Sequence, residues 1–477
     1  MTTIATSNWS SRNVWPLANG TPAVRPGLAS LYSAPASTRI VAAFSERCPR
    51  TDAMFHYVFT MSTSTTPTVL CRILDENMVE LAQVDTKASG VPVGISRAVV
   101  GDEILITSPS FATLWGLVGS GLVPAVKIDA NISTLTTLNV PRGICVSWAG
   151  RAVVVDGNSM YFSDALAPRT FTSDNFLDPP GGSVFGLHVS LGGSLIIATT
   201  TGVWALPEDA ATGGPSVLGV WSKLTDYTCV NYNTTCVSLG NVYGLTRKGY
   251  RRIDTEGAQD VPLDEPNITG NSASTTMGRI AVADYRSHAM FGGQAGPIVA
   301  LGESGDTHQP WHMTDLAAQS ETWWVYSAAT AGTSPLVGVG EDQDGRPLYA
   351  TEAAILRLEG SVDSTTPLAH LKGRLVTAPQ DSPVLRWVTF ASDTNSMRCS
   401  VFGTGTLKLP PQAAPIAGTT AWGAGPWREP PLRSRRFNFT RRTDDVAVEI
   451  TVSGYPSRIP ESVDFDFSGP GPQRESN

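Results

Sequence analysis

The sequence predicts an all-β protein with a degenerate β-propeller-like core, an extended N-terminal arm and a C-terminal β-sandwich-like domain. Short apolar, β-branched runs recur along most of the chain, and Gly, Asp and Asn separate them at turn positions. Glu, Lys and Ala do not recur at helical spacing, which excludes an all-α or coiled-coil fold. The 477 residues include 45 Gly and 34 Pro, and only 16% are charged, as is typical of many short strands joined by tight turns.

Changes of composition along the chain predict its domain organisation. The first residues are poor in charge and rich in Ser, Thr, Ala and Pro, whereas Pro becomes frequent again after residue 361. We expect an extended arm over residues 1–45, a β-propeller-like domain over 46–360, a C-terminal β domain over 361–468 and a flexible tail over 469–477.

Residues 150–206 show the strand pattern most clearly. An apolar run at 152–155 is followed by the hairpin turn signal Asp156-Gly157-Asn158 and by a returning strand at 159–163. The pattern repeats at 195–206. Short strands joined in this way form antiparallel meanders rather than parallel β-α-β units.

An insert at residues 165–184 interrupts this pattern. We interpret it as a long loop, and long loops in compact domains are often functional. Phe171, Phe176 and Leu177 are its large apolar residues. We therefore expect the insert to pack against a neighbouring subunit through these three side chains.

Two alternatives fit the N-terminal arm, which cannot bury itself alone. It is either a frayed terminus or an arm laid over a neighbouring subunit, with Trp9 and Trp15 as anchors. Two tryptophans so close together favour the second alternative. Arg25-Pro26-Gly27 then marks a turn after an extended segment.

Blade-like groups of strands follow the clearest stretch. Four closely spaced candidate strands lie between residues 228 and 253, as a propeller blade requires. Weaker groups lie at 280–301 and 323–358, without a strict period, so the number of blades cannot be derived. Candidate strands at 371–377, 385–391, 397–402, 435–439 and 447–452 predict a small β-sandwich-like domain.

The composition also bears on partners and compartment. A formal charge of −8 argues against a general nucleic-acid coat, which would be basic. The six cysteines are scattered without a Cys-x-x-Cys pair, so we expect no zinc site and expect most of them to be buried thiols, while pairing between some of them stays an open alternative. We expect neither a signal peptide nor a transmembrane helix.

Two motifs resemble metal sites without completing them. His308 and His312 are separated by Pro310, which prevents the helix that a two-histidine metal site needs, so we expect a loop with exposed histidines. The segment 341–345 resembles a calcium loop, but Thr351 stands where the final Glu ligand belongs, so we expect an acidic β-turn. We predict no metal, no cofactor and no catalytic residues.

One basic concentration occurs near the C-terminus, where Arg433, Arg435 and Arg436 begin an arginine-rich segment. On a strand, Arg433 and Arg435 share a face with Phe437. The segment either contacts a nucleic-acid backbone or pairs with acidic residues of a neighbouring subunit. Asp444 and Asp445 lower its local charge, which favours the subunit interface.

The segment at Arg25-Pro26-Gly27-Leu28, together with pieces of 150–206, resembles the nozzle or hub proteins of short-tailed bacteriophages. The pieces are Tyr-Phe-Ser-Asp at 161–164, Asn-Phe-Leu-Asp at 175–178, Leu-Ile-Ile-Ala-Thr at 195–199 and Gly-Val-Trp at 202–204. Together they cover about a third of the chain at the level of motifs. Each piece alone is common in β-strands of unrelated proteins. Nothing after residue 270 shares the resemblance.

The resemblance implies a non-enzymatic structural protein of the virion tail, assembled in the cytoplasm of the bacterial host. It implies a homohexamer at the tip of the tail tube, below the adaptor ring and beside a needle or plug and fibres or tailspikes. Double-stranded DNA would be retained by the ring and pass through it at genome ejection, without sequence specificity. An acidic lumen would keep DNA mobile, and Asp342 and Asp344 are candidates to line it.

The alternative is a carbohydrate-binding or sialidase-like propeller of a phage tail. Such a protein would carry repeated Asp-box motifs or a cluster of carboxylates and arginines at the propeller mouth. The sequence holds only a faint echo of one Asp box near Ser304 and Trp311. A propeller that binds cellular partners would carry repeat signatures that are missing here.

Overall fold

The computed structural model consists of strands and turns. It describes residues 2–5, 10–12, 14–16, 22–24, 27–88, 90–124, 143–207, 221–226, 229, 231–246, 249–254, 257–260, 289–294, 296–300, 310–315, 320–325, 336–358, 368–372, 376–377, 384–392, 397–403, 412–413, 433–442, 445–453, 460 and 462–468. No helix occurs among these residues, so none has the length and hydropathy to span a membrane. The predicted tail at 469–477 lies outside them.

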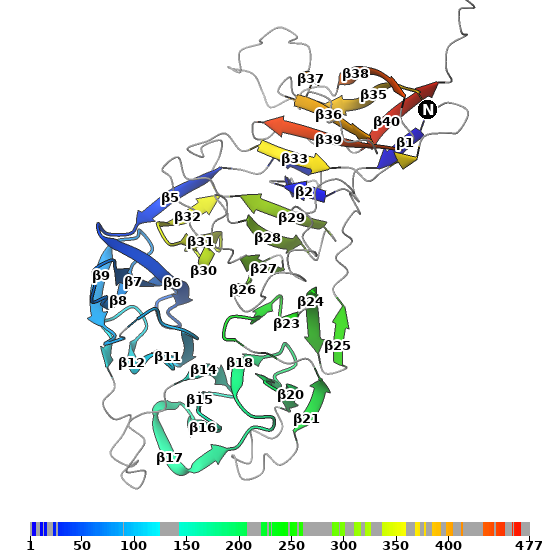
Figure 1. Ribbon diagram of the computed structural model, residues 1–477. Helices are drawn as coiled ribbons and strands as arrows, with labels where there is room; N and C mark the ends of the chain where they lie inside the picture. Colours follow the sequence, from blue (N-terminus) through cyan, green and yellow to red (C-terminus); the bar gives the residue numbers. More distant parts are fainter. Residues whose placement is uncertain are drawn as a thin grey trace, which may run out of the picture.

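The strands from β5 to β32 form a β-propeller of seven four-stranded blades. Four blades are separate sheets, and three are parts of larger sheets. They follow one another around a closed ring (Figure 1). The first blade is β6 (Thr38–Arg47), β7 (Met54–Ser62), β8 (Val69–Leu74) and β9 (Glu80–Asp85). The second is β10 (Ser96–Val100), β11 (Glu103–Ser108), β12 (Phe111–Leu117) and β13 (Val123–Pro124).

The third to fifth blades follow the same antiparallel order. The third is β14 (Ile144–Trp148), β15 (Arg151–Asp156), β16 (Ser159–Asp164) and β17 (Ala167–Leu177). The fourth is β18 (Val184–Val189), β19 (Leu195–Thr199), β20 (Gly202–Leu206) and β21 (Ser222–Thr225). The fifth is β22 (Thr235–Ser238), β23 (Asn241–Thr246), β24 (Gly249–Asp254) and β25 (Gly257–Asp260).

The last two blades close the ring. The sixth is β26 (Ala289–Gly292), β27 (Pro297–Ala300), β28 (Pro310–Asp315) and β29 (Ser320–Val325). The seventh is β30 (Leu336–Glu341), β31 (Pro347–Thr351), β32 (Ala354–Leu358) and, from the other end of the chain, β5 (Leu28–Ser33). β30 also pairs with β6 in parallel at Gly338 and Ala43. The ring is thus closed in two ways: β5 from the N-terminal side completes the seventh blade, and β6 pairs with β30 at the seam between the first and seventh blades.

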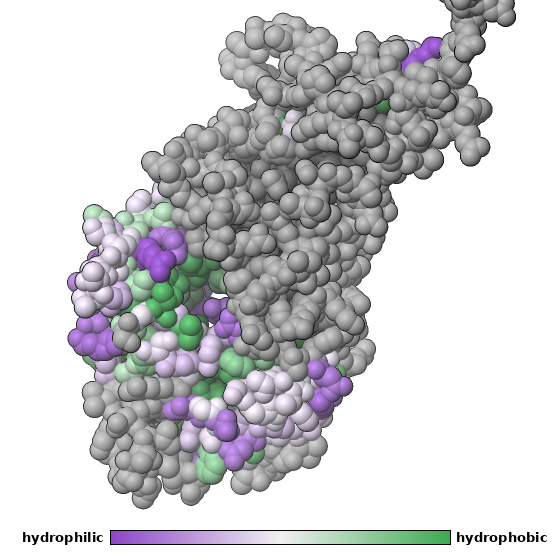
Figure 2. Space-filling view, viewed as in Figure 1, coloured by the Kyte–Doolittle hydropathy of each residue, from purple (hydrophilic) through white to green (hydrophobic). Residues whose placement is uncertain are grey.

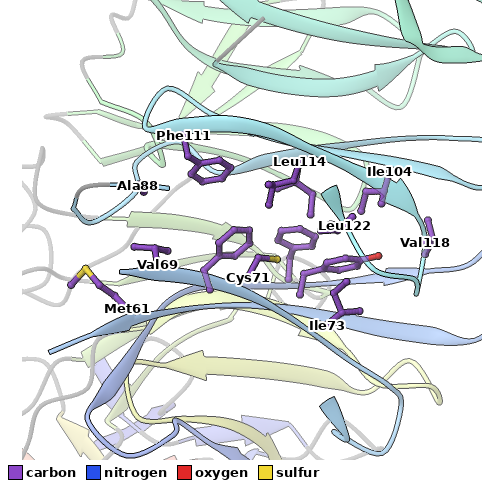
Figure 3. Close-up of a cluster of buried hydrophobic side chains, with 14 of the residues drawn as sticks. Met61, Val69, Cys71, Ile73, Ala88, Ile104, Phe111, Leu114, Val118 and Leu122 are labelled. Atoms are coloured by element: carbon purple, nitrogen blue, oxygen red, sulfur yellow. The ribbon is translucent and has the colours of Figure 1, made fainter. Parts of the chain in front are cut away.

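The hydrophobic core lies between the blades. Val69 and Cys71 of the first blade pack against Ile104, Phe111 and Leu114 of the second (Figure 3). Similar clusters of buried aliphatic side chains join the second blade to the third, the third to the fourth, the fourth to the fifth, the sixth to the seventh and the seventh to the first. Because each blade is apolar on both faces, it is stable only between two neighbours.

Two further sheets form the C-terminal domain. Its own strands are β33 (Leu368–Lys372), β34 (Val376–Thr377), β35 (Val384–Ser392), β36 (Met397–Gly403), β37 (Gln412–Ala413), β38 (Arg433–Arg442), β39 (Asp445–Ser453) and β40 (Ser462–Ser468). One sheet has the order β1-β40-β35-β38, and the other contains β33, β39 and β36. Val388, Val448 and Phe465 are buried in this sandwich-like domain.

The N-terminal segment is extended, but its described strands pair within their own chain. β1 (Thr2–Ala5) pairs with β40, and β2 (Ser10–Arg12) lies between β29 and β33. β3 (Val14–Pro16) and β4 (Pro22–Val24) form a hairpin. The expectation of an arm lying on a neighbour stays a prediction, because these pairings are those of a single chain. The expected boundary at residue 45 also falls inside β6.

Candidate functional site in the centre of the propeller

A central cavity of about 560 Å³ is the candidate functional site. Residues from the first strand of every blade line it, namely β6, β10, β14, β18, β22, β26 and β30. Figure 2 shows a depression at the centre of the ring with hydrophobic residues on its wall. Phe44, Phe185, Tyr232 and Phe291 supply the aromatic part of this wall.

The charged groups of the cavity neutralise each other. Arg97 of the second blade forms an ion pair with Glu46 of the first blade. The Arg97 guanidinium also lies over the Phe44 ring, with its carbon 4.6 Å from the ring centroid. Arg97 thereby joins two blades through a charge pair and a cation–π contact.

His188 lines the cavity from β18 of the fourth blade as a neutral imidazole. Its Nε2 lies 2.7 Å from Oγ1 of Thr235, which joins the fourth and fifth blades. Burial lowers the pKa of His188 to about 4, because desolvation disfavours the imidazolium. At Gly186 a Cβ would overlap Thr235 Oγ1, so glycine is what lets β18 and β22 approach.

Serine hydroxyls join the second and third blades. The Cys145 amide donates to Ser96 Oγ at 2.7 Å. Ser147 Oγ accepts from the Val99 amide at 2.6 Å and donates to the Val99 carbonyl at 2.7 Å. These polar groups of the wall are therefore used to hold blades together rather than to meet a ligand.

The chemistry available to the described residues is limited. They contain no group of three or more His, Cys, Asp or Glu side chains that could hold a metal ion. All six cysteines are buried free thiols, which confirms the prediction made for most of them and removes the alternative of a disulfide. Burial raises the pKa of Cys145 to about 11 and that of Cys229 to about 12, so neither thiol is a nucleophile near neutral pH.

A second polar group is buried at the seam between the seventh and first blades. Ser45 Oγ accepts from the Glu341 amide at 3.1 Å and lies 2.9 Å from Nδ1 of His56. The tautomer of the imidazole decides which of these two atoms donates, and the other ring nitrogen is Nε2. That nitrogen is buried without a hydrogen-bond partner. Burial lowers the pKa of His56 to about 4, although Asp342 opposes the shift.

The geometry of Asp342 corrects the expectation that this residue lines a lumen. Its side chain is only 6% exposed, and Oδ2 lies 3.1 Å from Nη1 of Arg357. Oδ1 accepts from the amides of Asp344 and Arg346 at 3.0 and 2.8 Å. The predicted acidic turn is thus confirmed, but Asp342 shapes the turn and does not face a channel. Asp344 is exposed and pairs with Arg346 at 3.1 Å.

The expected interface residues of the insert have different positions. The insert is not a loop, because β17 occupies most of it and pairs with β16. Phe171 is 2% exposed in the core between the second and third blades, so its expected interface role is wrong. Leu177 is partly buried against the third and fourth blades. Phe176 is 47% exposed and lies beside Tyr161, which leaves it available to a partner.

The remaining expected site residues are described only in part. Trp9, Arg25 and His308 lie outside the described residues. Trp15 is in β3, and His312 is in β28 rather than in a loop. The backbone register places Arg433, Arg435 and Arg436 of β38 opposite Ser392, Phe390 and Thr389 of β35.

Sequence reasoning missed the cavity wall, since none of its residues belongs to a motif. Glu46, Arg97, His188 and Thr235 come from strands far apart in the sequence. No local pattern marks the four residues, because each stands at a different position within the first strand of its blade.

Comparisons with known proteins concern the fold. No family model and no curated protein matches the chain. A structure of YCF48 bound to D1 peptide is similar over 71% of this chain and 100% of its own, with 11% identity and a TM-score of 0.39. PorZ, a surface component of the type-IX secretion system of Porphyromonas gingivalis, is similar over 74% of this chain and 44% of its own, with 10% identity and a TM-score of 0.37. The extracellular domain of BT4673 from B. thetaiotaomicron is similar over 96% of this chain and 62% of its own, with 9% identity and a TM-score of 0.39.

Proposed function

We propose that this β-propeller protein is a structural subunit of the tail nozzle of a short-tailed bacteriophage. Six copies would form a ring below the adaptor, retain the packaged genome and let double-stranded DNA pass at ejection. The needle or plug and the fibres or tailspikes would be neighbours in the virion tail.

The observation that carries the proposal is the order of the nozzle-like segments along two adjacent blades. Tyr-Phe-Ser-Asp at 161–164 lies in β16, and Asn-Phe-Leu-Asp at 175–178 lies at the end of β17 and just after it. Leu-Ile-Ile-Ala-Thr is β19, and Gly-Val-Trp begins β20. The resemblance therefore follows one contiguous unit of the fold rather than unrelated strands.

The size of the central cavity bears on the path that we propose for DNA. A volume of about 560 Å³ suits a small molecule and not a duplex. In the proposed assembly, DNA passes along the common axis of the ring, between subunits and not through a propeller. The mutual pairing of Arg97 and Glu46 also agrees with a structural use of the cavity wall.

Sedimentation and negative-stain imaging of the purified protein test the proposal. We expect six-fold rings, and we expect an antibody against this chain to label the tail tip of virions that contain it. A protein that stays monomeric at high concentration, or that labels no tail, would overturn the proposal. Release of sugars from bacterial surface glycans would instead favour the carbohydrate-active alternative.

A further inference from the structure

The strands β1 and β2 occupy positions in the C-terminal domain that any copy of the chain could fill. β1 adds to the sheet edge at β40, where Thr3 pairs with Asp464. β2 fits between two domains, because Arg12 pairs with Trp323 of β29 and with His370 of β33. In the described part of the chain, β29 and β33 meet only through β2. The two strands thus tie the sixth blade to the C-terminal domain.

These two strands are held much more weakly than β5. β1 has four residues and β2 has three, with the sequences Thr-Thr-Ile-Ala and Ser-Ser-Arg. Ser-Ser-Arg is wholly polar, and strands as short as these two make few backbone hydrogen bonds, so they are more prone to exchange than a longer strand. β5 has six residues, and its Leu28 is buried in the core between the sixth and seventh blades. β5 is therefore a fixed part of the propeller.

The order of synthesis favours exchange of the weak strands. β1 and β2 are made first, but their partners β29, β33 and β40 begin only at residues 320, 368 and 462. The arm is consequently unpaired while the propeller is produced. When several copies fold together, the arm of one chain meets the vacant positions of another at high local concentration.

We propose that β1 and β2 exchange between copies in the assembled protein, so that the arm of each subunit completes the C-terminal domain of a neighbour. The exchanged strands make the same backbone hydrogen bonds as in the closed monomer, so exchange costs little beyond the hinge. It links neighbouring subunits through the backbone. The inference rests on the proposed ring, because it requires a second copy.

Cysteine cross-linking distinguishes exchanged from unexchanged strands. Copies carrying Thr3→Cys are co-expressed with copies carrying Asp464→Cys, and the assembled fraction is oxidised and run on a non-reducing gel. The native cysteines are buried and do not interfere. We expect disulfide-linked pairs of chains. The matched control is a mixture of Ser33→Cys copies and Ala354→Cys copies, because these positions pair between β5 and β32. Since β5 does not exchange, this mixture should give no linked chains.

Both pairs are also placed within single chains as positive controls. The exchange would be overturned if, in an assembled ring, Thr3→Cys/Asp464→Cys formed disulfides only within single chains and the mixture gave no linked chains. The proposal of a ring would not be affected by that result. Sedimentation of the same samples reports assembly separately. A protein that never assembles would overturn both the ring and the exchange.

Discussion

Oδ2 of Asp342 lies 3.1 Å from Nη1 of Arg357, and this contact fastens the turn between β30 and β31 to β32. The two side chains are 6% and 23% exposed, so the pair is largely removed from water. Loss of one charge leaves the other buried without its partner, which costs more than the pair itself contributes. The closing blade therefore depends on a contact whose members are close together only in the folded chain.

Asp342→Asn should lower the stability of the propeller. The amide oxygen can still accept from the turn amides, but the Arg357 cation loses its carboxylate, so we expect a loss of roughly 3 kcal/mol in urea denaturation. Asp344→Asn is the matched control, because its pair with Arg346 is 65% and 56% exposed and should contribute less than about 1 kcal/mol. Equal effects of the two substitutions would contradict the structural role of Asp342.

His56 should make the protein less stable in acid. Its pKa is about 4 in the fold, against 6.5 for an ordinary histidine. Between these values the unfolded chain binds a proton that the folded chain does not, so stability falls as the pH drops from 6.5 to about 4. The full difference is about 3 kcal/mol.

Denaturation of the wild type and of His56→Gln at pH 7.5 and pH 4.5 checks this dependence. The variant should lose less stability than the wild type between the two pH values, since glutamine does not titrate. The comparison isolates His56 from Asp75, Glu76 and Asp342, whose charges act on it and which are the same in both proteins. An identical pH dependence of stability in the two proteins would show that the pKa of His56 does not differ between the folded and the unfolded chain.

Substitution by alanine should lower the stability of the propeller at Phe171 but leave it almost unchanged at Phe176. Phe171→Ala empties a site in the core between two blades and should cost about 3–5 kcal/mol. Phe176→Ala removes an exposed ring and should change the stability of the monomer by less than about 0.5 kcal/mol. Thermal unfolding measures the first effect, and sedimentation asks whether the second residue supports assembly. A stable Phe171→Ala protein would contradict the buried position of that ring.

Local patterns in the sequence predict much of the fold. The turn at Asp156-Gly157-Asn158 is present, and Gly157 has a φ of +62° there. The predicted strands at 152–155 and 159–163 correspond to β15 and β16. These elements are predictable because a hairpin turn and period-two apolar residues are both encoded within a few positions.

The closure of the ring could not be predicted in the same way. The sequence groups residues 323–358 as one blade, but Trp323 belongs to β29 of the sixth blade. The seventh blade takes β5 instead, from the other end of the chain. β17 was missed because register shifts opposite Ser163 break its alternation. Asp342 has an acidic, turn-like surrounding sequence, and its burial depends on Arg357 of β32, which the sequence places 15 residues away.

Gly338→Ala should weaken the seam between the seventh and first blades. A Cβ at position 338 would overlap the backbone of Ala43, and a backbone neighbour cannot turn aside as a flexible side chain could. We expect β30 to separate from β6 at this point and the unfolding free energy to fall by about 1–3 kcal/mol. Gly192→Ala is the matched control, since a Cβ there meets nothing within 4 Å and should change stability by less than about 0.5 kcal/mol. Hydrogen exchange should show faster exchange in β6 and β30 for Gly338→Ala alone. Equal exchange in these strands for both variants would mean that the seam does not depend on the close approach of Gly338 to Ala43.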